Sequence, residues 1–216
     1  MKKKIAILGS TGSIGKTTIE IIKKDKKKFD IILLTANNNF KEINKQIKYL
    51  KPKNLVINNK KVYFKLKKKF KKINIFNNFD LFFKKFNNKV DYTISAISGL
   101  SGLQPTLDII KHTKNVAIAN KESIICAWNL IEKELKKNNT KFIPVDSEHF
   151  SIWYLLKNKK IKTVKEIVIT ASGGPFLNWK VNKIKKATPR FAIKHPNWSM
   201  GKKISVDSAT MMNKVF

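Results

Sequence analysis

Cysteine and arginine are almost missing from this sequence. Among its 216 residues, Cys126 is the one cysteine and Arg190 the one arginine. A single cysteine cannot form a disulfide within the chain, which favours a reducing compartment. The apolar residues around Cys126 predict a buried structural thiol rather than a nucleophile.

Acidic residues are also few. Fourteen acidic residues face 46 basic ones, and the net charge of +32 would by itself suggest an anionic partner such as nucleic acid. Nearly all of this charge is lysine, scattered along the whole chain among many Asn, Ile and Phe residues, as in proteins of AT-rich bacterial genomes. A nucleic-acid surface would more often concentrate its charge and use arginine for bidentate contacts. We therefore expect no specific nucleic-acid partner.

Long apolar runs are absent as well. The longest fall far short of the roughly 20 residues that cross a bilayer, so we expect no membrane partner. Hydrophobic residues still make up 42% of the sequence, a globular composition. Because Met1–Lys4 runs straight into an apolar segment, no signal peptide is expected, and a cytoplasmic location follows.

Short β-branched runs alternate with amphipathic stretches through the first two-thirds of the sequence. This alternation predicts a Rossmann-type parallel sheet with helices on both faces. The expected strands are Lys4–Leu8, Asp30–Leu34, Asn54–Ile57, Ile73–Phe76, Tyr92–Ser95, Asn115–Ala119 and Lys141–Val145. The expected helices are Ile14–Lys24, Lys41–Tyr49, Leu103–Lys111 and Glu122–Lys136, with one more on each side of Ile73–Phe76.

The pattern changes after Pro144, and we place a domain boundary near Phe150. Residues 1–149 would then form one domain, and residues 150–216 would form part of a second, α+β domain. A helix over Phe150–Leu156 and a strand over Val164–Thr170 are expected in this second part.

Three glycines, Gly9, Gly12 and Gly15, follow the first strand and open the first helix. Glycine at these points permits a tight turn, close approach of a pyrophosphate and close helix–strand packing, which predicts a dinucleotide site. An ordinary turn is the alternative. The second strand ends at Leu34 without a following carboxylate, which favours NADP over NAD, and Lys41 is the nearest cation for a 2′-phosphate.

Asp146 and Glu148 lie two residues apart at the end of a strand. On an extended backbone this spacing aims both carboxylates to one side, and such a pair suits Mg²⁺ or Mn²⁺. Helix capping explains the same residues equally well.

Later segments supply groups that suit a phosphorylated ligand. Ser172 and its following glycines end a predicted strand, and the run 207–214 offers hydroxyls, an amide and a cation. Between them, Trp198 and Met200 lie in a segment bounded by proline and glycine, which could cover a ligand.

Six segments taken together resemble the 1-deoxy-D-xylulose 5-phosphate reductoisomerase family. They occur in the family's order, and the resemblance spans essentially the whole sequence. The segments are residues 9–15, 119–122, 144–149, 172–176, 195–201 and 205–214.

The resemblance implies an NADPH- and metal-dependent conversion of 1-deoxy-D-xylulose 5-phosphate to 2-C-methyl-D-erythritol 4-phosphate, in isoprenoid precursor synthesis. It also implies that residues 1–149 form the NADPH-binding domain and that residues 150–216 form part of the catalytic domain, with a mobile loop. The implied cofactor-binding residues are Thr11, Gly12, Ser13, Ile14, Ala36, Asn37, Asn38, Asn120 and Glu122. The implied substrate-binding residues are Lys121, Ser147, Glu148, Ser172, His195, Ser208, Asn213 and Lys214. Asp146 and Glu148 would bind Mg²⁺ or Mn²⁺, or Co²⁺, and would act in catalysis with Lys121 and His195.

The sequence also departs from the family pattern. Asn37 stands where a basic residue is common, and Val215 stands where glycine is usual. A further metal-binding glutamate would follow Phe216, with a carboxy-terminal helical domain beyond it. This chain alone is therefore expected to form an incomplete metal site, and the full-length protein a homodimer. The alternatives are another NADP-dependent Rossmann dehydrogenase and a truncated, non-catalytic remnant.

Overall fold

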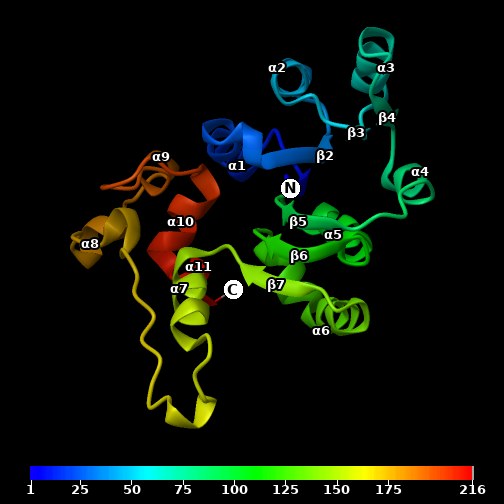
Figure 1. Cartoon of the computed structure of the whole chain (residues 1–216). Helices are drawn as coiled ribbons and strands as arrows, with labels where there is room; N and C mark the ends of the chain where they lie inside the picture. The colour runs from blue at the N-terminus through cyan, green and yellow to red at the C-terminus, as the bar shows by residue number, and fades with distance from the viewer. Residues whose placement is uncertain (216) are drawn as a thin grey trace. The chain divides into compact units, whose positions relative to one another are not determined.

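The computed structural model describes residues 1–215, without the side chains of Asn213 and Val215. The chain divides into two compact units, Met1–Phe150 and a second that begins at Ser151. Figure 1 follows the elements along the chain. The functions assigned to residues 1–149 and 150–216 remain predictions.

The first unit is built on seven parallel strands in the order β4-β3-β2-β1-β5-β6-β7. Their bounds are β1 Lys3–Leu8, β2 Phe29–Ala36, β3 Asn54–Ile57, β4 Asn74–Phe76, β5 Val90–Ser95, β6 Thr113–Ile118 and β7 Lys141–Pro144. Strands β2, β3 and β4 lie on one side of β1, and strands β5, β6 and β7 lie on the other. The strand order therefore reverses between the neighbouring strands β1 and β5. Every expected strand of this unit is present, with ends that lie within two residues of those predicted, and the predicted Rossmann-type fold is confirmed.

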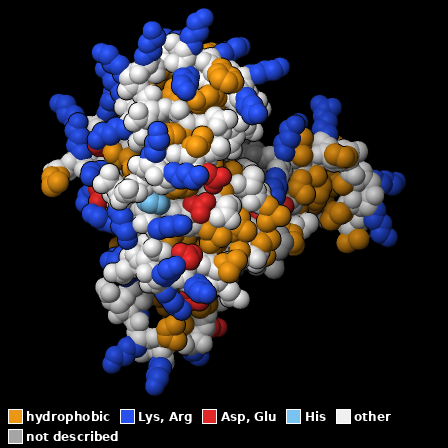
Figure 2. All heavy atoms as spheres, turned by 90° about the vertical axis from the view of Figure 1, so that its right-hand side faces the viewer, with side chains coloured by type: hydrophobic (Ala, Val, Ile, Leu, Met, Phe, Trp, Pro, Cys, Tyr) orange, Lys and Arg blue, Asp and Glu red, His pale blue; other side chains and the backbone are white. Residues whose placement is uncertain are grey.

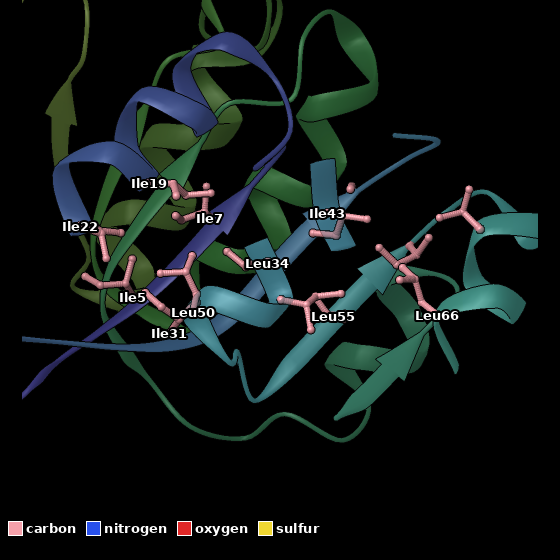
Figure 3. Packing of buried hydrophobic residues seen from close by; sticks show 14 residues of the cluster. Ile5, Ile7, Ile19, Ile22, Ile31, Leu34, Ile43, Leu50, Leu55 and Leu66 are labelled. Carbon is pink, nitrogen blue, oxygen red and sulfur yellow. The ribbon is translucent and has the colours of Figure 1, made fainter. Parts of the chain in front are cut away.

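Helices cover both faces of this sheet. They are α1 Ser13–Lys24, α2 Phe40–Leu50, α3 Lys60–Lys69, α4 Phe79–Phe83, α5 Leu103–Ile110 and α6 Lys121–Asn138, with short 3-10 turns η1 Lys26–Lys28 and η2 Leu100–Gly102. Ile5 and Ile7 of β1 pack with α1, α2 and α3 in one core, which Figure 3 shows. Ala6 and Leu8, the alternate residues, pack with α4 and α5 in another. The last four residues of β1 are all apolar and buried, which suits a sheet covered on both faces.

Asparagine side chains mark where several of these helices begin. Asn39, Asn59, Asn78 and Asn120 precede α2, α3, α4 and α6, and each accepts a hydrogen bond from the backbone N–H three residues later. Such caps satisfy one of the N–H groups that a helix start leaves without a partner. The many asparagines of this sequence therefore serve a local structural purpose.

Helix α7, Ser147–Leu156, spans the boundary between the units, and short elements follow it. These are η3 Ile161–Thr163, η4 Gly174–Phe176, α8 Val181–Ile184, α9 Pro189–Ala192, α10 Lys202–Thr210 and α11 Met212–Val215. The strand predicted over Val164–Thr170 is wrong: the segment pairs with no strand among residues 1–215, and its side chains are mostly exposed. A β-strand needs a neighbouring ladder, which sequence alternation cannot supply.

The described side chains of the second unit form no fully buried apolar core. Aromatic contacts hold its centre instead: Trp179 lies edge-on to Phe176 and Phe191, with ring centroids 5.0 and 5.3 Å apart. In addition, Gly174 packs directly on the backbone of Ala209 in α10, where a side chain at position 174 would overlap it.

Three predictions about the charge, the cysteine and membrane crossing can be compared with the structure. Figure 2 shows Lys and Arg side chains spread over the visible face rather than gathered into one patch. Cys126 is exposed, so the prediction of a buried thiol is wrong; Ala127 is the residue that α6 turns inward at this point. None of the helices described in residues 1–215 combines the length and apolarity needed to cross a bilayer.

Candidate functional site

The glycine turn lies at the point where the strand order reverses. Gly9 directly follows β1 and adopts φ +78°, a conformation that glycine enters without strain. A side chain at Gly9 would also come within 2.6 Å of the carbonyl oxygen of Ala96, which follows β5. The two central strands thus come together directly below the turn, where open α/β sheets bind ligands.

Gly12 and Gly15 differ in what surrounds them. A Cβ on Gly15 would overlap the Gly9 carbonyl oxygen, so this glycine lets α1 pack against the turn. A Cβ on Gly12 would meet its nearest atom, again the Gly9 carbonyl oxygen, at 3.4 Å. Gly12 is exposed and lines a cavity, so the space beside it is free for a ligand. The turn therefore forms a cradle that a side chain at residue 12 would fill.

Two residues that sequence reasoning did not single out hold the turn in place. Thr35, at the end of β2, accepts a hydrogen bond from the Gly9 N–H at 2.8 Å through its hydroxyl, and its carbonyl accepts from the Ser10 N–H at 2.9 Å. Gln46, buried on α2, donates to the Ser10 carbonyl at 2.9 Å. The sequence offered one sign of this role: Gln46 is a polar residue on the helix face that otherwise carries Ile43, Ile47 and Leu50.

A cavity of about 230 Å³ opens at the carboxyl ends of these strands. The predicted residues Thr11, Ala36 and Asn37 line it, together with Asn58 and Phe79, which the sequence analysis missed. The other predicted cofactor residues near the turn, Ser13, Ile14 and Asn38, are exposed and do not line it.

Asn120 is buried, with a side chain that is fully engaged. Its amide nitrogen donates to the carbonyls of Ile97 and Gly99 at 2.6 and 2.7 Å, and its oxygen accepts from the Ser123 N–H at 3.1 Å. Asn120 thus joins the start of α6 to the loop after β5, and that loop lines the cavity. The Asn120 side chain therefore fixes the position of a loop that lines the cavity. Glu122, the other predicted cofactor residue of this segment, is half-buried in the first turn of α6.

Asp146 is the centre of a cluster that follows β7. Its Oδ2 lies 2.7 Å from the Lys121 Nζ, and its Oδ1 lies 2.8 Å from the His149 Nδ1. Ser147 donates to the Glu148 carboxylate at 2.8 Å. Three of the residues predicted for catalysis, Lys121, Asp146 and Glu148, therefore lie in the same part of the first unit.

The pKa of Asp146 is held well below its usual range. Burial acts in the opposite direction and is the largest single influence, but hydrogen bonds from Lys121 and His149, a hydrogen bond shared with Glu148 and the charge of Lys121 outweigh it. The net direction agrees with the short contact to Lys121. Asp146 is consequently a carboxylate at neutral pH.

The backbone around this pair is not the extended strand that the spacing argument assumed. Strand β7 ends at Pro144, α7 begins at Ser147, and the Phe150 N–H donates to the Asp146 carbonyl at 2.8 Å. Asp146 thus occupies the capping position at the start of α7. The helical turn still brings the two carboxylates close enough for Glu148 to influence the pKa of Asp146. Capping and ligand binding are compatible uses of this residue.

Two carboxylates offer the hard oxygen ligands that Mg²⁺ and Mn²⁺ take, and the cluster already attracts a cationic side chain. Among the described residues, however, no three His, Cys, Asp or Glu side chains gather in a metal-binding arrangement. Asp146 and Glu148 can therefore supply some, but not all, of the ligands in the coordination shell of a divalent cation.

In the second unit, Ser172 and His195 meet across 23 residues of sequence. The Ser172 hydroxyl lies 2.9 Å from the His195 Nε2, and the N–H groups of Asn197 and Trp198 both donate to His195 Nδ1 at 3.2 Å. An Nδ1 that accepts two hydrogen bonds carries no proton, so the proton lies on Nε2 and points at Ser172. The ring also stacks on Trp198, which is 59% exposed, at 4.9 Å.

The remaining substrate residues lie on α10 and α11. Ser208 is buried, and its hydroxyl donates to the Ser205 carbonyl at 2.7 Å. Lys214 is half-buried on α11. The side chain of Asn213, also predicted for the substrate, lies outside the described residues.

The sheet order and the glycine cradle define an α/β protein of the nucleotide-binding Rossmann type. Among known families, the model described as 1-deoxy-D-xylulose 5-phosphate reductoisomerase matches residues 5–128, and the model of that enzyme's C-terminal domain matches residues 142–216. The chain belongs to the 1-deoxy-D-xylulose 5-phosphate reductoisomerase family.

Individual relatives agree with this assignment. The chain is 58% identical to the 1-deoxy-D-xylulose 5-phosphate reductoisomerase of Pelagibacter ubique strain HTCC1062, over 99% of this chain and 56% of that protein. It is 41% identical to the Wolbachia pipientis wMel enzyme, over 98% of this chain and 54% of the relative. The chain thus spans about half the length of the curated relatives it matches.

Solved structures of the same enzyme superpose closely. The Zymomonas mobilis reductoisomerase in complex with NADPH is 36% identical, with a TM-score of 0.86 over 99% of this chain and 56% of that one. A reductoisomerase in complex with NADPH, fosmidomycin and magnesium is 32% identical, with a TM-score of 0.86 over 98% of this chain and 55% of that one.

Proposed function

We propose that the protein converts 1-deoxy-D-xylulose 5-phosphate to 2-C-methyl-D-erythritol 4-phosphate, using NADPH and a divalent cation, in isoprenoid precursor synthesis. The observation that carries this proposal is that the glycine cradle and the Asp146 cluster follow strands of one sheet. The glycine cradle follows β1 and the Asp146 carboxylate follows β7. Carboxyl ends of parallel strands share one edge, so a reductant and a Lewis acid can serve the same substrate.

NADPH would lie along the cradle, with its pyrophosphate at the start of α1 beside Thr11, Gly12, Ser13 and Ile14. The adenosine end would approach Ala36, Asn37 and Asn38. The family's relatives include structures solved with NADPH. Because no carboxylate follows β2 to repel a 2′-phosphate, NADPH should bind better than NADH, and the exposed Lys41 is the nearest cation.

Asp146 and Glu148 would hold Mg²⁺ or Mn²⁺, or Co²⁺, through their carboxylates. Bound there, the cation would polarise and orient substrate oxygens. Ser147 and Lys121 are close enough to Asp146 and Glu148 to contact the same substrate. A relative solved with NADPH, fosmidomycin and magnesium supports a small phosphorylated substrate and a divalent metal.

Residues of the second unit are also proposed to bind the substrate. Ser172 and His195, already in contact, would bind the substrate under a mobile loop that carries Trp198 and Met200. Ser208, Asn213 and Lys214 would bind its phosphate. With its proton on Nε2, His195 would act as a hydrogen-bond donor to the substrate rather than as a base.

We also propose that the full-length protein is cytoplasmic and forms a homodimer.

The test is NADPH oxidation followed by absorbance, with 1-deoxy-D-xylulose 5-phosphate and Mn²⁺, on the complete protein that carries this sequence. Oxidation that requires both the sugar phosphate and the metal supports the proposal. NADPH binding without any oxidation, with 1-deoxy-D-xylulose 5-phosphate unchanged, would refute it. NADH in place of NADPH should give much slower oxidation, and faster oxidation would contradict the cofactor assignment.

A further inference from the structure

Lys121 and Asp146 form a partly buried ion pair. Their Nζ and Oδ2 atoms are 2.7 Å apart, and the side chains are 23% and 16% exposed. In the pairs Lys53–Asp30 and Lys114–Asp91, by comparison, the lysine side chain is 58% and 64% exposed. A partly buried carboxylate is costly without a positive partner, so this pair compensates a charge that the site keeps away from water.

The same oxygen is one that a divalent cation would use. Asp146 is one of the two carboxylates assigned to the metal in the proposed function, and Lys121 now contacts its Oδ2. An ammonium and a divalent cation repel each other at such distances, because like charges interact strongly where water is scarce. The two cations therefore compete for Asp146.

The backbone of Lys121 has little freedom to take part in this exchange. Lys121 is the first residue of α6, directly after Asn120, whose side chain makes three hydrogen bonds. A lysine side chain has a flexible four-carbon stem, so its ammonium can leave Asp146 by rotation alone.

We propose that Lys121 is the resident counter-cation of Asp146 in the metal-free protein and that divalent metal binding displaces it. The displaced ammonium then becomes available to the anionic or oxygen-rich substrate. Metal binding thereby prepares the substrate site, and the substrate binds better after the metal than before it. This inference rests on the proposed function, because it assumes the metal at Asp146.

The first experiment measures Mn²⁺ affinity of the complete protein, without substrate, from the electron paramagnetic resonance signal of free Mn²⁺. Lys121→Met should bind Mn²⁺ more tightly, by roughly tenfold, because the competing charge is gone. Lys121→Arg should stay close to wild type. Lys141→Met is the matched control: it removes an equal charge from the start of β7, at the other end of the strand that leads to Asp146.

The second experiment follows the Lys121 amine itself by its acetylation rate with a lysine-specific reagent, read by mass spectrometry. Mn²⁺ should increase the rate at Lys121 and leave the rate at Lys141 unchanged. Circular dichroism of each variant checks folding. If Lys121→Met folds poorly, Lys121→Gln replaces it, and the wild-type labelling result stands without any variant.

The outcomes separate the two proposals. If Asp146→Asn abolishes Mn²⁺ binding but Lys121→Met binds no more tightly than Lys141→Met, the metal site stands and the displacement is refuted. A Lys121 labelling rate that Mn²⁺ does not raise also refutes it. If Asp146→Asn leaves Mn²⁺ binding unchanged, the metal assignment in the proposed function fails, and this inference fails with it.

Discussion

Removing the Asn120 side chain should destabilise the first unit more than removing any ordinary helix cap. Asn120→Ala deletes the acceptor for the Ser123 N–H and both donors to the Ile97 and Gly99 carbonyls. A lost cap costs about 1 kcal/mol. Two partly buried carbonyls without donors add about 1 kcal/mol each, for a total of about 3 kcal/mol.

The measurement is urea unfolding followed by circular dichroism, with Asn39→Ala as the control. Asn39 caps α2 through one hydrogen bond and is exposed, so its loss should cost about 1 kcal/mol. Asn120→Asp separates the two roles of Asn120, because it keeps an acceptor for the cap but has no amide donors. It should resemble Asn120→Ala.

The same variants test the cavity wall. Ile97 and Ser98 line the cavity below the glycine turn, so Asn120→Ala should also weaken NADPH binding, measured by cofactor fluorescence. Asn39→Ala should leave that binding near wild type. Equal losses of stability in Asn120→Ala and Asn39→Ala would show that the bonds to the β5 loop contribute nothing, and the reasoning would be refuted.

Three further predictions concern the turn, the half-buried His112 and the metal pair. Gly12→Ala should change the stability by no more than about 0.5 kcal/mol and yet bind NADPH weakly. Gly15→Ala should lose stability in urea unfolding, because its Cβ overlaps the turn. A larger loss of stability in Gly12→Ala than in Gly15→Ala would contradict the cradle. Burial, the largest cause, lowers the pKa of His112 from 6.5, so stability should fall as pH decreases from above 6.5, because the unfolded state binds the proton first. His112→Phe should reduce the pH dependence of the melting temperature between about pH 8 and pH 5. An unchanged pH dependence would exclude this histidine as its cause. Asp146→Asn should abolish turnover while NADPH fluorescence titration stays near wild type; near-normal activity at limiting Mn²⁺ would leave capping as the function of Asp146.

The sequence by itself determined the elements of the first unit. Apolar runs and the glycine spacing act over a few neighbouring residues, so strands such as Asn54–Ile57 could be predicted to the residue. The glycine turn could be placed after β1 for the same reason. The six segments also sufficed to predict the family, because their order along the chain requires no three-dimensional information.

Only the tertiary structure decided which residues meet. Thr35 and Gln46 reach the turn from 26 and 36 residues away, and Lys121 reaches Asp146 from α6 to the end of β7. Such contacts depend on strand order and register, which local patterns leave open. Val164–Thr170 shows the converse: its pattern favours a strand, but a strand exists only where a neighbouring chain segment completes its hydrogen bonds.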